Sequence, residues 1–152
     1  MTKFIEKAQN CFRNFFLKRI IEKLKKKVET EFYDEVLELL LKAIRLFLYI
    51  NKDFRKNIDN FDAQYVFQSQ DGLIAASAIF KDEKMTVYED KIMNANVTVT
   101  FKDGKAIWDF LMSSKPDIFA FVLQNKLSYS GNLNYIMKFA YIANHLKLKF
   151  SL

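Results

Sequence analysis

The sequence has few of the residues that build disulfides, tight loops and catalytic sites. Its 152 residues include one cysteine, one histidine, one proline and three glycines. The single cysteine, Cys11, excludes an internal disulfide framework and suits a reducing compartment. The glycines stand alone at positions 72, 104 and 131, so the sequence lacks a glycine-rich phosphate-binding loop. With one histidine and one cysteine, it predicts no metal site, no cofactor and no Cys–His nucleophile pair.

The remaining polar residues offer little for catalysis. His145 comes near the end of the last predicted helix, where we expect a charged or capping role. Cys11 falls in an apolar stripe and is expected to act as a small buried hydrophobe. The acidic pairs Asp82-Glu83 and Glu89-Asp90 lie in predicted turns, where charge is normally solvated. We therefore predict that the protein is not an enzyme.

Long hydrophobic runs are also missing. The most apolar stretch, residues 36–50, is interrupted by Glu38, Lys42 and Arg45. It is shorter than the roughly 20 apolar residues that a membrane-spanning helix needs. The first eight residues carry three charged side chains and no export signal. The sequence therefore predicts a cytoplasmic protein, at most peripheral to a membrane.

Hydrophobic residues make up 51% of the chain, including 16 phenylalanines, which is enough for a substantial core. The charge is unevenly distributed. Residues 1–30 hold nine Lys/Arg and three Asp/Glu, a net charge of +6, whereas residues 31–152 hold fifteen of each. A basic segment attached to a neutral domain points to an anionic partner surface.

Residues 1–60 are predicted to form an amphipathic helical extension. From Phe4 to Val28 apolar residues recur at steps of three and four, and a second helix follows from Thr30 to Tyr49. The basic charge and the apolar stripe suit docking of the first helix on an anionic membrane, although most such stripes are buried in a core. Packing on its own domain, or dimerisation through these helices, is the alternative. The predicted docking residues are Phe12, Phe15, Phe16, Lys18, Arg19, Lys23, Lys25, Lys26 and Lys27.

Residues 61–152 are predicted to form one compact α+β domain. Near residue 61 the hydrophobic period changes from about 3.6 to 2, and Asp71-Gly72 is a strong hairpin signal. Asp103 is suited to cap a helix. The predicted strands are 64–69, 73–81, 85–89, 96–101 and 126–130, with Leu127 and Tyr129 of the last one pointing inward. The predicted helices are 103–112, 116–124 and 132–145.

The order of these elements, with particular residues, resembles the sterol carrier protein type-2 family. Residues 96–101 are similar to the strand that precedes that family's helical segment, which continues here through residues 110–123. Residues 126–132 then match the family's short strand, glycine and acidic or amide residue, with Gly131 and Asn132 in the last two places. The resemblance covers roughly residues 64–148.

The resemblance implies a five-stranded, mostly antiparallel sheet with helices on one face, enclosing an apolar tunnel for fatty acyl chains, sterols or similar lipids. Such proteins carry a lipid or present a hydrophobic substrate to an enzyme. A protein-interaction module with a filled core is the alternative function. A nucleic-acid partner is not expected, because only the lysines at 25–27 favour it.

Two features of the sequence itself suit a cavity. The last helix is apolar on two sides, and residues 75–78 place small side chains in the middle of the sheet. Ordinary core packing is the alternative explanation for both. The residues predicted to contact the ligand are Ala76, Ala78, Trp108, Phe110, Leu111, Met112, Phe119, Val122, Leu133, Ile136, Met137 and Ala140.

Overall fold

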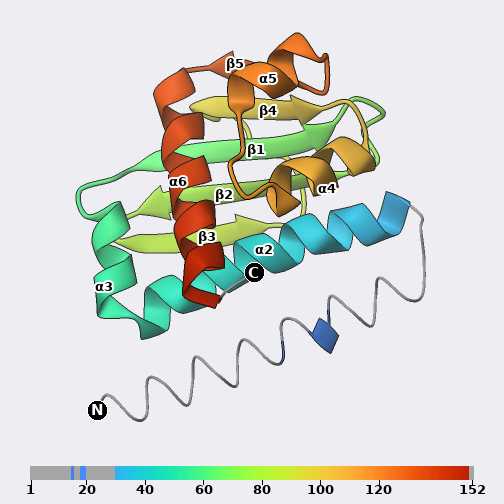
Figure 1. The fold of residues 1–152 in the computed structure, drawn as a ribbon. Helices are drawn as coiled ribbons and strands as arrows, with labels where there is room; N and C mark the ends of the chain where they lie inside the picture. Colours follow the sequence, from blue (N-terminus) through green and yellow to red (C-terminus); the bar gives the residue numbers. More distant parts are fainter. Residues whose placement is uncertain (1–14, 16–17, 20–29, 151–152) are drawn as a thin grey trace.

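The computed structural model describes residues 15, 18–19 and 30–150. Five strands form one sheet in the order β3-β2-β1-β4-β5, and helices α2, α4 and α6 lie on one of its faces (Figure 1). The elements are α2 (Thr30–Ile50), α3 (Lys52–Arg55), η1 (Lys56–Ile58), β1 (Ala63–Ser69), β2 (Ala75–Lys81), β3 (Lys84–Tyr88), β4 (Val97–Phe101), α4 (Gly104–Met112), α5 (Ile118–Leu123), β5 (Leu127–Gly131) and α6 (Leu133–Phe150).

The sheet is mixed but mostly antiparallel, which confirms the predicted α+β class. Strand β1 runs parallel to β4, and the pairs β1–β2, β2–β3 and β4–β5 are antiparallel. Alternation along the strands puts Tyr65 and Phe67 on the face toward the helices, beside Val97 and Val99 of β4. The opposite face carries residues such as Thr98 and is partly exposed. The alternating sequence predicts a sheet with one buried face and one solvent-exposed face.

Residues 89–96 join β3 to β4 and must cross β2 and β1, because those strands lie between them. Ser77 lies on the face of β2 that is turned away from the helices, and its side chain forms hydrogen bonds with this crossover. Its Oγ donates to the carbonyl oxygen of Asp90 at 2.6 Å and accepts from the backbone N–H of Ile92 at 3.1 Å. Both contacts explain why a serine is fully buried here.

Helix α2 belongs to the same hydrophobic core as the sheet. Leu37, Leu41 and Ile44 are at most 1% exposed. The segment 51–60, predicted as a last turn or linker, contains α3 and η1, and its Phe54 and Ile58 are fully buried. The predicted division of the chain into units 1–60 and 61–152 stays a prediction.

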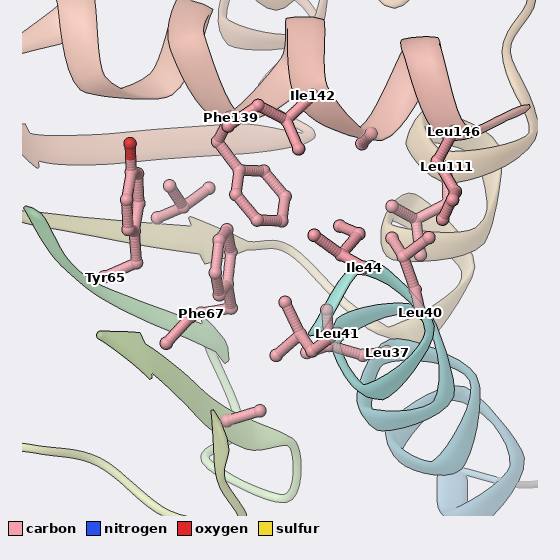
Figure 2. Packing of buried hydrophobic residues seen from close by; sticks show 14 of the residues in the cluster. Leu37, Leu40, Leu41, Ile44, Tyr65, Phe67, Leu111, Phe139, Ile142 and Leu146 are labelled. Carbon is pink, nitrogen blue, oxygen red and sulfur yellow. The ribbon is translucent and has the colours of Figure 1, made fainter. Parts of the chain in front are cut away.

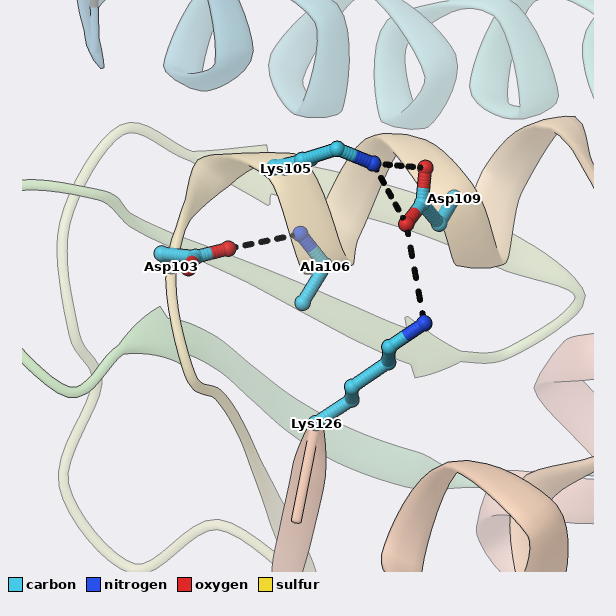
Figure 3. A network of polar contacts seen from close by, with 5 residues as sticks. All are labelled: Asp103, Lys105, Ala106, Asp109 and Lys126. Carbon is cyan, nitrogen blue, oxygen red and sulfur yellow. Dashed lines mark hydrogen bonds and ion pairs between the residues drawn. The ribbon is translucent and has the colours of Figure 1, made fainter. Parts of the chain in front are cut away.

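Side-chain caps fix the short helices. Asp103 caps α4 as expected, since its Oδ1 accepts from the backbone N–H of Ala106 at 2.8 Å (Figure 3). Asp109 of the same helix pairs with Lys105 at 2.9 Å and lies 3.8 Å from the ammonium of Lys126, just before β5. Asp117 caps α5 in the same way as Asp103.

Two details differ from the expectations. Tyr129 follows the inward register of Leu127, but it is 38% exposed because β5 is an edge strand. Helix α6 continues to Phe150, five residues beyond His145. Within residues 30–150, no helix combines the length and apolarity needed to cross a membrane.

Candidate functional site

The space between α6 and the sheet is filled by aromatic rings. Phe139 of α6 packs on two rings of β1, with its centroid 4.6 Å from that of Phe67 and 5.4 Å from that of Tyr65 (Figure 2). The Tyr65 hydroxyl donates to the carbonyl oxygen of Tyr135 at 2.8 Å, which ties β1 to α6. Burial raises the pKa of Tyr65, so this phenol stays a hydrogen-bond donor.

The twelve residues predicted to contact the ligand differ in how exposed their side chains are. Ala76 and Ala78 of β2 are fully buried beside α2, which contacts both β2 and β3, so the small side chains let the helix approach the sheet closely. In all, Ala76, Ala78, Phe110, Leu111 and Ile136 are buried. Trp108, Val122, Leu133 and Ala140 are half-buried, and Met112, Phe119 and Met137 are exposed.

Three of these residues line a narrow crevice between α2, α4 and α6. Its volume is about 20 Å³, room for little more than one water molecule. The lining is apolar except for two residues of α6, Asn144 and Lys147. The lining residues are Leu40, Phe110, Leu111, Pro116, Phe139, Ala140, Ala143, Asn144 and Lys147. Of the predicted set, Phe110, Leu111 and Ala140 are therefore brought together, and a lipid-sized tunnel stays a prediction.

Lys147 closes one side of this crevice. Its ammonium donates to the carbonyl oxygen of Leu111 at 2.9 Å and to that of Ser113 at 2.6 Å, where α4 ends. Within residues 30–150, it forms no ion pair with a carboxylate. Burial lowers the pKa of this lysine. A half-buried cation therefore sits in an apolar lining with only neutral partners.

A second, larger hollow was not anticipated. It is a groove of about 720 Å³ between α2 and the edge strand β3, with Leu39, Leu46 and Met85 among its apolar lining. A signal was present in the sequence: the charged residues of α2 gather on one stripe, and its wide apolar remainder includes Leu46 and Tyr49, which the sheet leaves exposed. The groove is bordered by charge, since Lys42 pairs with Glu38 at 2.9 Å and with Glu89 at 2.7 Å.

Three of the nine predicted membrane-docking residues lie in the part of the chain that the structure describes. Phe15 and Arg19 line the groove, and the Arg19 guanidinium carbon lies 5.3 Å from the centre of the Phe15 ring. Phe15 is nevertheless 57% exposed, and Lys18 is exposed as well. Phe12, Phe16, Lys23, Lys25, Lys26 and Lys27 lie outside the described residues.

His145 has a packing role in this structure. Its Nδ1 lies 3.1 Å from Nδ2 of Asn57, and its ring packs beside Phe54 at 5.3 Å between centroids. Burial, followed by the charge of Lys149, lowers its pKa, so the ring favours the neutral form. The expected charged or capping role is not what this position provides. Across residues 30–150, no three His, Cys, Asp or Glu side chains gather as metal ligands would.

Comparison with solved structures identifies the fold. UbiJ-SCP2, a ubiquinone synthesis protein, is 16% identical; the match covers 74% of this chain and 94% of that one, with a TM-score of 0.54. Sterol carrier protein 2 from Yarrowia lipolytica in its apo form is 19% identical, over 72% of this chain and 88% of that one, with a TM-score of 0.50.

The sec-alkylsulfatase Pisa1 from Pseudomonas sp. is 13% identical over 58% of this chain, with a TM-score of 0.51. The chain spans only 14% of that enzyme's length. No family model matches the sequence, and no curated protein matches it. The chain therefore has a fold like that of sterol carrier protein 2, as the resemblance in the sequence implied.

Proposed function

We propose that this sterol-carrier-like fold binds the apolar part of a lipid in the cytoplasm, to carry it or present it, and catalyses no reaction. One observation carries the proposal. Helix α6 buries Phe139 on the sheet, while the adjacent Ala140 and Ala143 line a crevice against α2 and α4. A helix that is apolar on two sides needs cover on both. Helices α2 and α4 cover the second side in the ligand-free protein, and a lipid chain between α6 and α4 takes over part of this cover when the crevice widens.

Widening is supported by the loose attachment of α5. Among its six residues only Ile118 is buried, whereas Phe119 is 57% and Leu123 is 82% exposed. Segments with few buried contacts open locally at low free-energy cost. Residues 113–117, which include the lining residue Pro116, connect α5 to α4. We propose that movement of residues 113–123 admits the ligand beside Ala140.

We expect protein purified from cells without detergent to carry less than one lipid per chain, detectable by native mass spectrometry and by denaturing extraction. Ala140→Trp places a large ring in the crevice, so this variant is expected to purify with background lipid only. Asn134→Trp is the matched control, because Asn134 is exposed on the same helix. Background lipid in the wild-type protein from several hosts would contradict the proposal.

An interaction module with a filled core is the alternative, and the small volume of the crevice favours it. In that case wild-type protein and Ala140→Trp carry equally little lipid. The Trp variant then loses stability, by about 1–3 kcal/mol, because the added ring overpacks the site.

We also propose that the N-terminal segment brings the protein to an anionic membrane. The net charge of +6 in residues 1–30 and the exposure of Phe15, Lys18 and Arg19 support this. Apolar rings enter the interface, and each nearby Lys or Arg adds about 1 kcal/mol against anionic lipid. Packing of the segment on the groove between α2 and β3, or pairing of two chains through it, is the alternative.

The full-length variant K25Q/K26Q/K27Q tests this proposal. Loss of three charges is expected to weaken binding to phosphatidylserine-containing vesicles by about 3 kcal/mol, roughly a hundredfold, in a co-sedimentation assay. The control removes the same charge from exposed lysines of the sheet domain, at Lys91, Lys102 and Lys115, and should bind nearly as the wild type does. Equal binding by both triple variants would remove the membrane role from the N-terminal segment.

A further inference from the structure

Among the described residues that line the crevice between α2, α4 and α6, Lys147 is the one with a charged side chain. Asn144 precedes it by three residues, so both polar groups lie on the same face of α6, one turn apart. Ala140 and Ala143 continue that lining toward the N-terminal end of the helix. The crevice thus has an apolar part and a polar end, as an amphiphile has.

Among the residues that the structure describes, the ammonium group of Lys147 uses two of its three hydrogen-bond donors. Lysine provides three N–H donors, and the structure assigns two of them to the carbonyl oxygens of Leu111 and Ser113. Both acceptors are neutral. A carboxylate is the stronger acceptor, since charge-assisted hydrogen bonds are roughly twice as strong as neutral ones. A cation held in this way is therefore ready to exchange its partners for an anion.

We propose that Lys147 is a specificity-determining residue that selects an acyl ligand with an anionic head group, and that capturing this head group releases the contact between α6 and the end of α4. This inference rests on the proposed lipid-binding function. In the ligand-free state, the bonds from Lys147 to Leu111 and Ser113 hold α4 against α6 and keep the crevice at about 20 Å³. A carboxylate that binds the ammonium group replaces those hydrogen bonds. Helix α4 can then move away from α6 as the acyl chain of the ligand enters.

The same geometry explains why a neutral lipid is disfavoured. A sterol hydroxyl or an ester offers Lys147 no charge, so opening the crevice would exchange two good carbonyl acceptors for one neutral acceptor. An anionic head group compensates for the lost bonds, and Asn144, which belongs to the same lining, offers a further N–H donor. The structure therefore separates ligands of equal chain length by the charge of their head groups.

The test compares dodecanoic acid with dodecan-1-ol, which have the same chain length, by isothermal titration calorimetry at a pH where the acid is ionised. Wild-type protein is expected to bind the acid about tenfold to a hundredfold more tightly than the alcohol, the range of a charged hydrogen bond. Lys147→Gln keeps N–H donors for Leu111 and Ser113 but removes the charge. Its ratio of the two affinities should fall to about one.

Lys149→Gln is the matched control, because Lys149 is an exposed lysine on the same helix and is outside the crevice lining. It should keep the wild-type ratio, and Lys147→Arg should keep most of it. Equal binding of acid and alcohol by the wild type, or an unchanged ratio in Lys147→Gln, would overturn the inference and leave the lipid-binding function standing. Failure of the wild type to bind either compound would instead reject both the lipid-binding function and the inference.

Discussion

Phe139→Ala is expected to lower the free energy of unfolding by about 3–5 kcal/mol, as large-to-small changes of buried aromatic residues do. Phe139 is 4% exposed and packs on Phe67 and Tyr65, the two rings at the centre of the sheet. Removing its ring deletes the contacts that seat α6 and leaves a cavity that neighbouring side chains fill only in part. Urea denaturation followed by circular dichroism measures the change.

Phe119→Ala serves as the control for this substitution. Phe119 is 57% exposed on α5, so its loss should change stability by about 0.5 kcal/mol or less. An unchanged m-value, which is the slope of the unfolding free energy against urea concentration, would confirm that both variants unfold from the same compact state. If Phe139→Ala cost no more than Phe119→Ala, α6 would not be packed on β1 as described.

Gly131→Ala should cost about 2–6 kcal/mol, since it combines strained backbone with a backbone collision, each contributing about 1–3 kcal/mol. Gly131 has a φ of +108° and pairs with Val97 at the end of β5. A Cβ atom at this position would approach the carbonyl oxygen of Asn96 too closely for any side-chain movement to relieve, because that oxygen belongs to the backbone. The strand end would have to shift.

The shift would reach β1, because Asn96 forms two hydrogen bonds with Gln64 of that strand. Its backbone N–H donates to the carbonyl oxygen of Gln64 at 2.9 Å, and its side-chain oxygen accepts from the N–H of Gln64 at 2.7 Å. Gly72→Ala is the matched control: Gly72 also has positive φ, at +74°, but nothing lies within 4 Å of the added atom. It should cost about 1 kcal/mol in thermal denaturation. Similar losses at both glycines would mean that contact with Asn96 is unimportant.

The sequence predicted those parts of the fold that depend on neighbouring residues. Alternation of Val97, Val99 and Phe101 placed β4 to within one residue of its observed start, and Asp103 marked the cap of α4. The parallel pairing of β1 with β4 depends on residues some thirty positions apart. The family resemblance implied a five-stranded, mostly antiparallel sheet and did not specify this pairing. Local pattern contains no information about that partner.

Packing between distant segments was the least predictable part. Phe54 and Ile58 are the only apolar residues of a polar decapeptide, yet both are fully buried in the common core. Phe54 packs between Phe47 of α2 and His145 of α6. For the same reason, the candidate site was predicted in part. The apolar pattern predicts Phe110, Leu111 and Ala140, which line the crevice. The same pattern does not distinguish Asn144 and Lys147 from solvated polar residues of a helix.

The aromatic contact between the two long helices bears on how the protein is made in the cell. Phe47 of α2 packs on Phe150 of α6, with 5.0 Å between ring centroids. At about 5–20 residues per second, a ribosome needs roughly 5–20 s to add Phe150 after Phe47. During that interval the apolar faces of α2 lack their final cover. The packing of α2 is therefore completed only after α6 has left the exit tunnel of the ribosome.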